Sequence, residues 1–186
     1  MPKQKITKEM VVEAAFELAR SGGMDAVMVK NIAEKLGCSV QPIYSYCKNM
    51  DGLRQDVMRR TEQFMKEYLS ANINPEDFFR STGHAYIKLS KDEPNIFQMF
   101  VLHKRDAISS LEDLYQSETN SEVAGYIAEG LNISMEKAKM LHMNMLIYTV
   151  GIGTILATAT PGISMDEILA QLEIAYQAFL KQALEA

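Results

Sequence analysis

The sequence predicts an all-α fold, and three observations carry this prediction. Apolar residues recur every three or four positions along nearly all of the 186 residues, which is the spacing of an amphipathic helix. The chain has only ten Gly and five Pro, which disfavours a fold with many tight turns. The sequence shows no alternating strand pattern of useful length, no internal repeat and no low-complexity tract.

Three short helices are predicted at the N-terminal end. The first begins after Thr7, whose hydroxyl is suited to cap it, and ends at the Ser-Gly-Gly cluster of residues 21–23. The second covers about residues 29–36, and Gly37, which can adopt a positive φ at a turn, ends it. The third covers about residues 39–46 and is capped by its first serine.

Longer helices are predicted beyond this region, the first over about residues 50–71. The others cover about residues 76–90, 94–104, 107–116, 121–131, 134–160 and 165–184. No charge lies between Lys139 and Asp166, a run long enough to span a bilayer. Because His, Asn, Thr and Gly interrupt this run, we interpret it as a helix buried between other helices rather than as a membrane span.

Composition and charge narrow the class of protein. The chain is 47% apolar and 23% charged, which is ordinary for a globular protein with a sizeable core. Two cysteines are too few for a disulfide framework, and no apolar run follows the basic N-terminus as in a signal peptide. We therefore expect a cytoplasmic protein without a membrane partner. Residues 1–60 carry a net charge of +3 and the remaining residues one of −8, which indicates an anionic partner at the N-terminal end.

Residues 28–47 are typical of a helix-turn-helix motif, because two short helices are joined by Gly37-Cys38-Ser39. The small Ala33 allows the two helices to cross closely. The expected core of this motif and the preceding helix consists of Val11, Leu18, Ile32, Leu36 and Ile43. Ser39 leaves the positive end of the next helix pointing outward, an arrangement that suits phosphates and the major groove.

The exposed face of the third helix favours DNA binding over the alternative of a plain helical hairpin in a bundle. Gln41, Tyr44, Ser45 and Lys48 place four polar donors, one of them a cation, within ten residues. The helix that carries them is too short to hold a bundle together.

Residues 6–58 resemble the tetracycline-repressor-type (TetR) family of transcriptional regulators. The matching residues are Ile32-Ala33, Leu36-Gly37-Cys38-Ser39, Ile43-Tyr44-Ser45-Tyr46, Lys48-Asn49 and Leu53. The resemblance implies a DNA-binding domain over residues 1–50 and a helical domain over 51–186 that dimerises and binds a small effector. It further implies a regulator, most often a repressor, that a small molecule releases from a palindromic operator.

By position, the resemblance places Tyr44 and Lys48 on phosphates and Gln41 with its neighbours on bases. The residues expected to contact DNA are Lys30, Ser39, Val40, Gln41, Pro42, Tyr44, Ser45 and Lys48. Three positions depart from the family pattern. Met28 stands where Thr or Ser usually caps the second helix, Cys47 replaces a Phe, and the Val40-Gln41-Pro42 segment prevents transfer of a known operator.

The last two helices are the dimerisation pair that the resemblance implies, with Gly151 and Gly153 allowing close approach. Met and aromatic residues are suited to line an effector pocket, although such residues at helical spacing are more often ordinary core. The candidate effector contacts are Phe97, Phe100, His103, Met140, Met143 and Tyr148.

Other functions are disfavoured. The sequence contains no nucleophile elbow, zinc-protease motif or phosphate loop, so we expect no enzyme. The three histidines have no carboxylate or Cys at ligand spacing, so we expect no metal and no cofactor. Two alternatives remain open. One is a helical protein-interaction or small-molecule-binding module without DNA binding, and the other is a redox sensor at Cys38 or Cys47.

Overall fold

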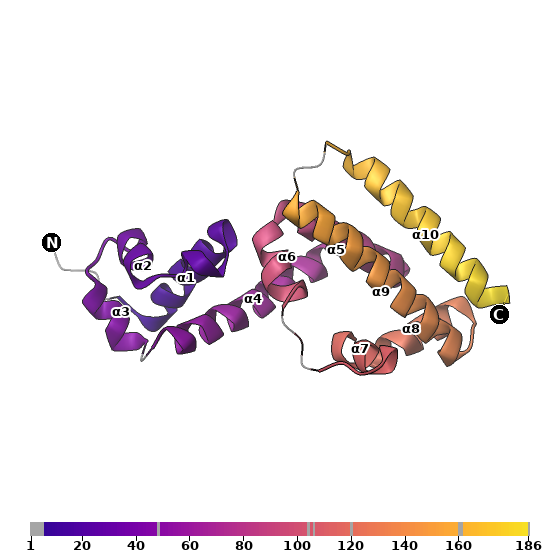
Figure 1. Ribbon diagram of the computed structural model, residues 1–186, viewed down its shortest axis with the longest axis horizontal. Coiled ribbons are helices and arrows are strands. Elements are labelled where there is room, and N and C mark those ends of the chain that lie inside the picture. Colours follow the sequence, from indigo (N-terminus) through magenta and orange to yellow (C-terminus); the bar gives the residue numbers. More distant parts are fainter. Residues whose placement is uncertain are drawn as a thin grey trace. The chain divides into compact units, whose positions relative to one another are not determined.

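The computed structural model describes residues 6–47, 49–103, 105, 107–119, 121–159 and 162–185. These residues form α-helices and two 3-10 turns without any strand (Figure 1), which confirms the predicted all-α class. In chain order the elements are α1 (Lys8–Gly22), η1 (Met24–Ala26), α2 (Val29–Lys35), α3 (Val40–Tyr46), α4 (Met50–Asn72), η2 (Pro75–Asp77), α5 (Phe78–Asp92), α6 (Pro94–Val101), α7 (Leu111–Glu118), α8 (Ser121–Leu131), α9 (Met135–Thr158) and α10 (Met165–Glu185).

The chain divides into two compact units. The first comprises Met1–Ala71 with Asp92–His103, and the second comprises Asn72–Lys91 with Lys104–Ala186. The first unit extends past residue 50, where the sequence placed a domain boundary, because Leu53 and Val57 of α4 are buried in the same cluster as the helix-turn-helix. The helix α6, which the sequence placed in the effector domain, also belongs to the first unit.

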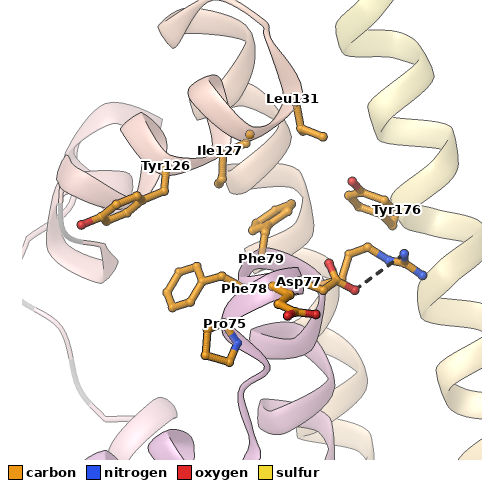
Figure 2. A pocket seen from close by; sticks show the side chains of 11 residues that line it. Pro75, Asp77, Phe78, Phe79, Tyr126, Ile127, Leu131 and Tyr176 are labelled. Atoms are coloured by element: carbon orange, nitrogen blue, oxygen red, sulfur yellow. Dashed lines mark ion pairs between the residues drawn. The ribbon is translucent and has the colours of Figure 1, made fainter.

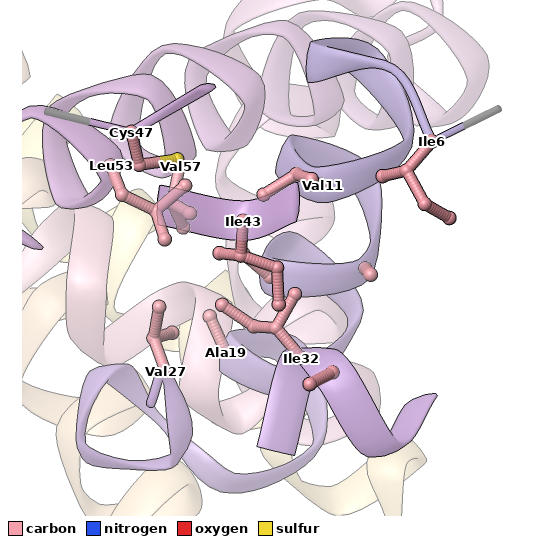
Figure 3. Packing of buried hydrophobic residues seen from close by; sticks show 12 residues of the cluster. Ile6, Val11, Ala19, Val27, Ile32, Ile43, Cys47, Leu53 and Val57 are labelled. Atoms are coloured by element: carbon pink, nitrogen blue, oxygen red, sulfur yellow. The ribbon is translucent and has the colours of Figure 1, made fainter. Parts of the chain in front are cut away.

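The core of the first unit confirms the packing expected of a helix-turn-helix. Val11, Ile32 and Ile43 are fully buried in one cluster (Figure 3), and Leu18 and Leu36 pack against it half-buried. Local signals fix where the helices begin and end. The Thr7 hydroxyl accepts a hydrogen bond from the backbone N–H of Met10, and Gly23 with φ of 72° ends α1. Full burial of one such aliphatic side chain contributes about 2 kcal/mol.

Polar contacts hold α6 against the end of α1. The Arg20 guanidinium donates from Nε to Oε2 of Glu93 at 2.8 Å, and Glu93 occupies the N-cap position of α6. The Asn95 side-chain amide donates to the backbone carbonyl of Arg20 at 2.9 Å. Phe97 on the same helix is fully buried. These contacts explain why α6 belongs to the first unit.

The second unit is built on the antiparallel pair α9 and α10, with α8 packed against α9. Leu141, Met145 and Leu156 of α9 and Ile168 and Leu172 of α10 belong to its core cluster. By length and composition alone, α9 could cross a membrane, although one such helix is weak evidence. Its buried positions agree with the prediction of a helix packed between others.

One predicted helix is displaced in the structure. The segment expected to be helical over residues 107–116 forms α7 over Leu111–Glu118, so Ser117 lies on a helix rather than in a loop. The displacement has a local cause, because the Ser110 hydroxyl accepts a hydrogen bond from the backbone N–H of Asp113 and thereby caps the helix at Ser110. Similarly, α6 ends at Val101 rather than near residue 104.

A histidine in the second unit makes the stability of the fold depend on pH. Nδ1 of His142 lies 2.9 Å from the Tyr115 hydroxyl, and the rings of Tyr115 and Phe79 meet the imidazole edge-on. Burial lowers the pKa of His142 from 6.5 to about 4. The imidazole is therefore neutral near pH 7, and its Nδ1 shares a hydrogen bond with the Tyr115 hydroxyl.

We expect acidification to destabilise the protein through His142. Between pH 6.5 and 4 the unfolded chain binds a proton at this histidine that the folded chain does not bind. The free energy of unfolding should therefore fall as the pH falls through this window, by about 2 kcal/mol at pH 4.5 from this group. Urea unfolding of the wild type and of His142→Leu at pH 7 and 4.5 measures the effect. The variant should lose less stability on acidification, and equal losses in both proteins would contradict the assignment.

Candidate nucleic-acid interface and a groove in the second unit

The turn between α2 and α3 has the geometry that the motif predicts. Gly37 has a φ of 62°, which favours glycine. The backbone N–H of Gly37 donates to the carbonyl of Glu34, and that of Cys38 donates to the carbonyl of Ala33 at 3.0 Å. These bonds close the end of α2 and set the direction in which α3 leaves the turn.

Ser39 occupies the N-cap position of α3, as predicted, but its side chain makes no capping hydrogen bond. Pro42, at the third position of the helix, has no N–H and so removes one of the two donors that an N-cap side chain can use. The exposed Ser39 hydroxyl is therefore not engaged by the helix end. It lies where an incoming phosphate would meet the positive end of α3.

The side chains predicted to contact DNA lie mainly on the outer face of the motif. Val40, Gln41, Tyr44 and Ser45 are exposed on α3, with Tyr44 at 59% exposure, and Pro42 is half-buried. The Ser45 hydroxyl donates to the backbone carbonyl of Gln41 at 3.1 Å, so its remaining capacity toward DNA is that of an acceptor. The structure therefore groups these side chains on one short helix.

The predicted interface contains two cationic residues, Lys30 and Lys48. Lys30 is exposed near the start of α2. Lys48 lies outside the described residues. The end of α3 is anchored by Tyr46, whose hydroxyl donates to the backbone carbonyl of Ile6 at 2.7 Å. This bond ties α3 to the segment before α1.

The departure at Met28 is a missing helix cap. Met28 is the N-cap residue of α2 and makes no side-chain capping bond. Its side chain is exposed, so replacing it removes little buried surface. The Asn31 side-chain amide of α2 donates to the backbone carbonyl of Ala26 at 2.9 Å, and this bond connects the helix to the segment that precedes it.

A Met28→Thr substitution should therefore stabilise the protein by about 1 kcal/mol, because the threonine hydroxyl can accept a backbone hydrogen bond from the first turn of α2. Met28→Ala removes the same side chain without adding a cap and serves as the control. Urea unfolding of the two variants measures the difference. Equal stability of the threonine and alanine variants would show that the open end of α2 has no energetic consequence.

The buried cysteine of this region is not poised for redox chemistry. Cys47 belongs to the core cluster of the first unit, and burial raises the pKa of its thiol. Because the thiolate is the reactive form, this environment disfavours oxidation.

The residues predicted to bind an effector are divided between the two units. Phe97, Phe100 and His103 belong to the first unit, where Phe97 is fully buried. The other three, Met140, Met143 and Tyr148, lie half-buried on α9 in the second unit. The Tyr148 hydroxyl accepts a hydrogen bond from the Gln171 side chain at 3.1 Å.

A groove of about 510 Å³ lies within the second unit and is lined by none of these six residues. Its walls come from η2 and the start of α5, the second half of α8, and α10 (Figure 2). The aromatic residues that line it are Phe78, Phe79, Tyr126 and Tyr176. Sequence reasoning missed this groove because its walls are brought together only by the packing of three helices. The acidic and aromatic run Glu76-Asp77-Phe78-Phe79 was its one local signal.

Within the part of the chain that the structure describes, no three His, Cys, Asp or Glu side chains gather as metal ligands would.

The N-terminal region is similar to known bacterial regulators. Residues 11–57 match the model of the bacterial regulatory proteins of the tetR family. An uncharacterized HTH-type transcriptional regulator of Bacillus subtilis (strain 168), YobS, is 19% identical over 108 residues. That alignment covers 56% of each chain, so the match spans little more than half of the relative.

Solved structures share the fold over nearly the whole chain. A TetR-like transcriptional regulator from Rhodococcus sp. RHA1 superposes with a TM-score of 0.61 at 13% identity, covering 97% of this chain and 99% of that one. A second Rhodococcus regulator gives 0.60 at 13% identity, covering 95% and 97%. A TetR variant from Acinetobacter baumannii AYE in complex with minocycline gives 0.57 at 18% identity, covering 96% and 99%.

Proposed function

We propose that this chain, whose residues 11–57 match the model of the bacterial regulatory proteins of the tetR family, is a homodimeric repressor that a small molecule releases from a palindromic operator. The observation that carries the proposal is the exposed face of α3. Gln41 and Tyr44 are exposed on a short helix whose start has no side-chain capping bond, which leaves its backbone N–H groups available to a phosphate. An acidic protein has no other evident reason to expose such a face at its basic end.

We expect the DNA-contacting residues to have two roles: some bind phosphates and position the protein, and others contact bases and recognise the sequence. Ser39, at the start of α3, and Tyr44, on its outer face, contact phosphates through their hydroxyls. Lys48, two residues after α3 in the sequence, adds a cation for a further phosphate. Gln41 and Val40 are the residues that meet base edges in the major groove, because recognition helices read bases with their N-terminal residues. A glutamine amide pairs well with adenine, and a valine side chain can contact a thymine methyl.

The dimer is proposed to form through α9 and α10. On α9, Ile147 and Ile155 are exposed, and Gly151 lies between them on the same face, four residues from each. On α10, Ile174 is also exposed. Two subunits related by a two-fold axis would cover these residues and present two α3 helices to successive half-sites of a palindrome. Such a regulator acts on DNA in the cytoplasm.

Selection from a random duplex library tests this function. The full-length protein should enrich one sequence family with two inverted half-sites about one helical turn apart. Enrichment of no sequence, together with equal affinity for all duplexes, would instead assign the chain to a helical binding module without DNA recognition.

Two substitutions separate reading from positioning on the selected duplex. Gln41→Ala should lose discrimination at one base pair of each half-site by about 1–3 kcal/mol. Lys48→Ala should weaken binding to all duplexes alike and flatten the dependence of log Kd on log salt by about one unit. Fluorescence anisotropy with the selected duplex and single-base variants of it measures both. If both substitutions only scale the affinity uniformly, Gln41 is not a base reader.

A further inference from the structure

The groove in the second unit has more negative than positive charge. Glu76 and Asp77 line it together with Arg80. The Arg80 guanidinium is already occupied, since Nη2 donates to Oε2 of Glu173 at 2.7 Å and Nη1 lies 3.7 Å from Oδ2 of Asp77. Among the described residues, none pairs as a cation with the Glu76 carboxylate. An anionic ligand would therefore meet the Glu76 carboxylate, which no cation of the described residues compensates.

The aromatic residues of the groove also favour a cationic ligand. At one side of the groove the rings of Phe78 and Tyr126 stand 6.2 Å apart between centroids at an interplanar angle of 57° (Figure 2). Both rings are exposed, and Tyr126 is exposed over 63% of its surface. Large aromatic rings that are open to solvent, in a groove that the Glu76 carboxylate also lines, are the components of a site for organic cations.

The groove already holds one cation in this way. The Arg80 guanidinium lies over the ring of Tyr176, 5.5 Å from its centroid, and is flanked by carboxylates. Phe78, Tyr126 and Glu76 offer the same combination of ring and carboxylate, but no internal cation fills it among the described residues.

We propose that this groove binds a lipophilic cation, a small molecule with an aromatic body and one positive charge, and that this molecule is the effector. The regulatory part of the proposal rests on the proposed function, whereas the binding part does not. The apolar body fills the space lined by Phe79, Ile127 and Leu131. The charge faces Glu76 and the ring faces of Phe78 and Tyr126.

A matched pair of probes separates this proposal from simple hydrophobic binding. Tetraphenylphosphonium and tetraphenylborate carry the same four phenyl groups and opposite charges. Calorimetric titration of the full-length protein, without DNA, should show one tetraphenylphosphonium per chain. Tetraphenylborate should bind at least roughly tenfold more weakly, because like charges repel it from the groove. Equal binding of both probes, or binding of neither, would overturn the proposal.

Substitutions of the groove residues test whether the cation binds in this groove. Glu76→Gln should weaken tetraphenylphosphonium binding roughly fivefold and leave tetraphenylborate binding no weaker, because it removes only charge. Tyr126→Ala should weaken the binding of both probes. Both side chains are exposed, so the variants should fold, and thermal unfolding verifies this. Glu136→Gln removes an exposed carboxylate that does not line the groove and should change nothing.

The same variants decide between two roles for Glu76. It stands in the first turn of η2, before α5, where a carboxylate also stabilises a helix start. If Glu76→Gln lowers the melting temperature while tetraphenylphosphonium binding is unchanged, the carboxylate serves the helix and the cation site is refuted.

A final arm adds the selected palindromic duplex. Tetraphenylphosphonium should lower the affinity of the wild type for this duplex and have a smaller effect on Glu76→Gln. Selective cation binding without any DNA binding would refute the proposed function but not the cation site. DNA binding without selective cation binding would refute the cation site alone. Binding of both without coupling would refute the effector role.

Discussion

A Gly151→Glu variant is expected to fold and to remain a monomer. A Cβ added at this exposed position meets nothing within 4 Å in the subunit, so we expect the isolated chain to accommodate the glutamate. Ile147 and Ile155, at 50% and 59% exposure, flank it on the same face of α9. In the proposed dimer the carboxylate would be buried without a partner, at a cost of several kcal/mol. Binding to the palindrome should be lost with the dimer.

Light scattering and circular dichroism measure this result, and two matched variants control it. Gly153 is two residues away but buried inside the subunit, so Gly153→Glu should unfold the second unit rather than yield a folded monomer. Ser117 is exposed on α7, and Ser117→Glu should leave a folded dimer. A Gly151→Glu protein that stays dimeric and binds the palindrome would place the interface elsewhere.

Phe97→Ala is expected to destabilise the first unit by about 3–5 kcal/mol, because deleting a fully buried phenyl ring leaves a cavity. Phe97 is fully buried on α6, the helix that Glu93 and Asn95 join to the end of α1. The sequence suggested an effector contact for this residue. That role would instead predict a loss of ligand affinity at nearly unchanged stability.

Urea unfolding distinguishes the two roles of Phe97. Phe100 lies on the same helix and is half-buried, so Phe100→Ala should cost less than Phe97→Ala. A loss below about 1 kcal/mol for Phe97→Ala would contradict a core role.

Local chemistry made much of the fold predictable. The side chain of Thr7 and the positive φ of Gly37 act on their own neighbours in sequence. These residue types therefore predicted where α1 begins and where α2 ends. For α7 the Ser110 cap was present in the sequence but was not identified there, and the predicted helix was therefore displaced by several residues.

Features that depend on contacts between residues far apart in sequence could not be predicted. Because apolar residues are spread around all sides of α9, periodicity could not show that Gly153 faces inward and Gly151 outward. The groove joins Phe78, Tyr126 and Tyr176, which lie some 50 residues apart in sequence and on three helices. No local pattern relates such residues, so only the packed second unit identifies them as one site.

The dependence of operator affinity on salt tests the central claim most directly. The full-length protein is titrated against the selected palindrome between 50 and 200 mM NaCl, with a duplex carrying one scrambled half-site in parallel. If two α3 helices grip the duplex through phosphate contacts, the palindrome should bind more tightly than the half-site at every salt concentration. Its affinity should also fall by about a thousandfold over this range. Equal affinity for both duplexes, or an affinity that does not change with salt, would contradict dimeric DNA recognition by α3.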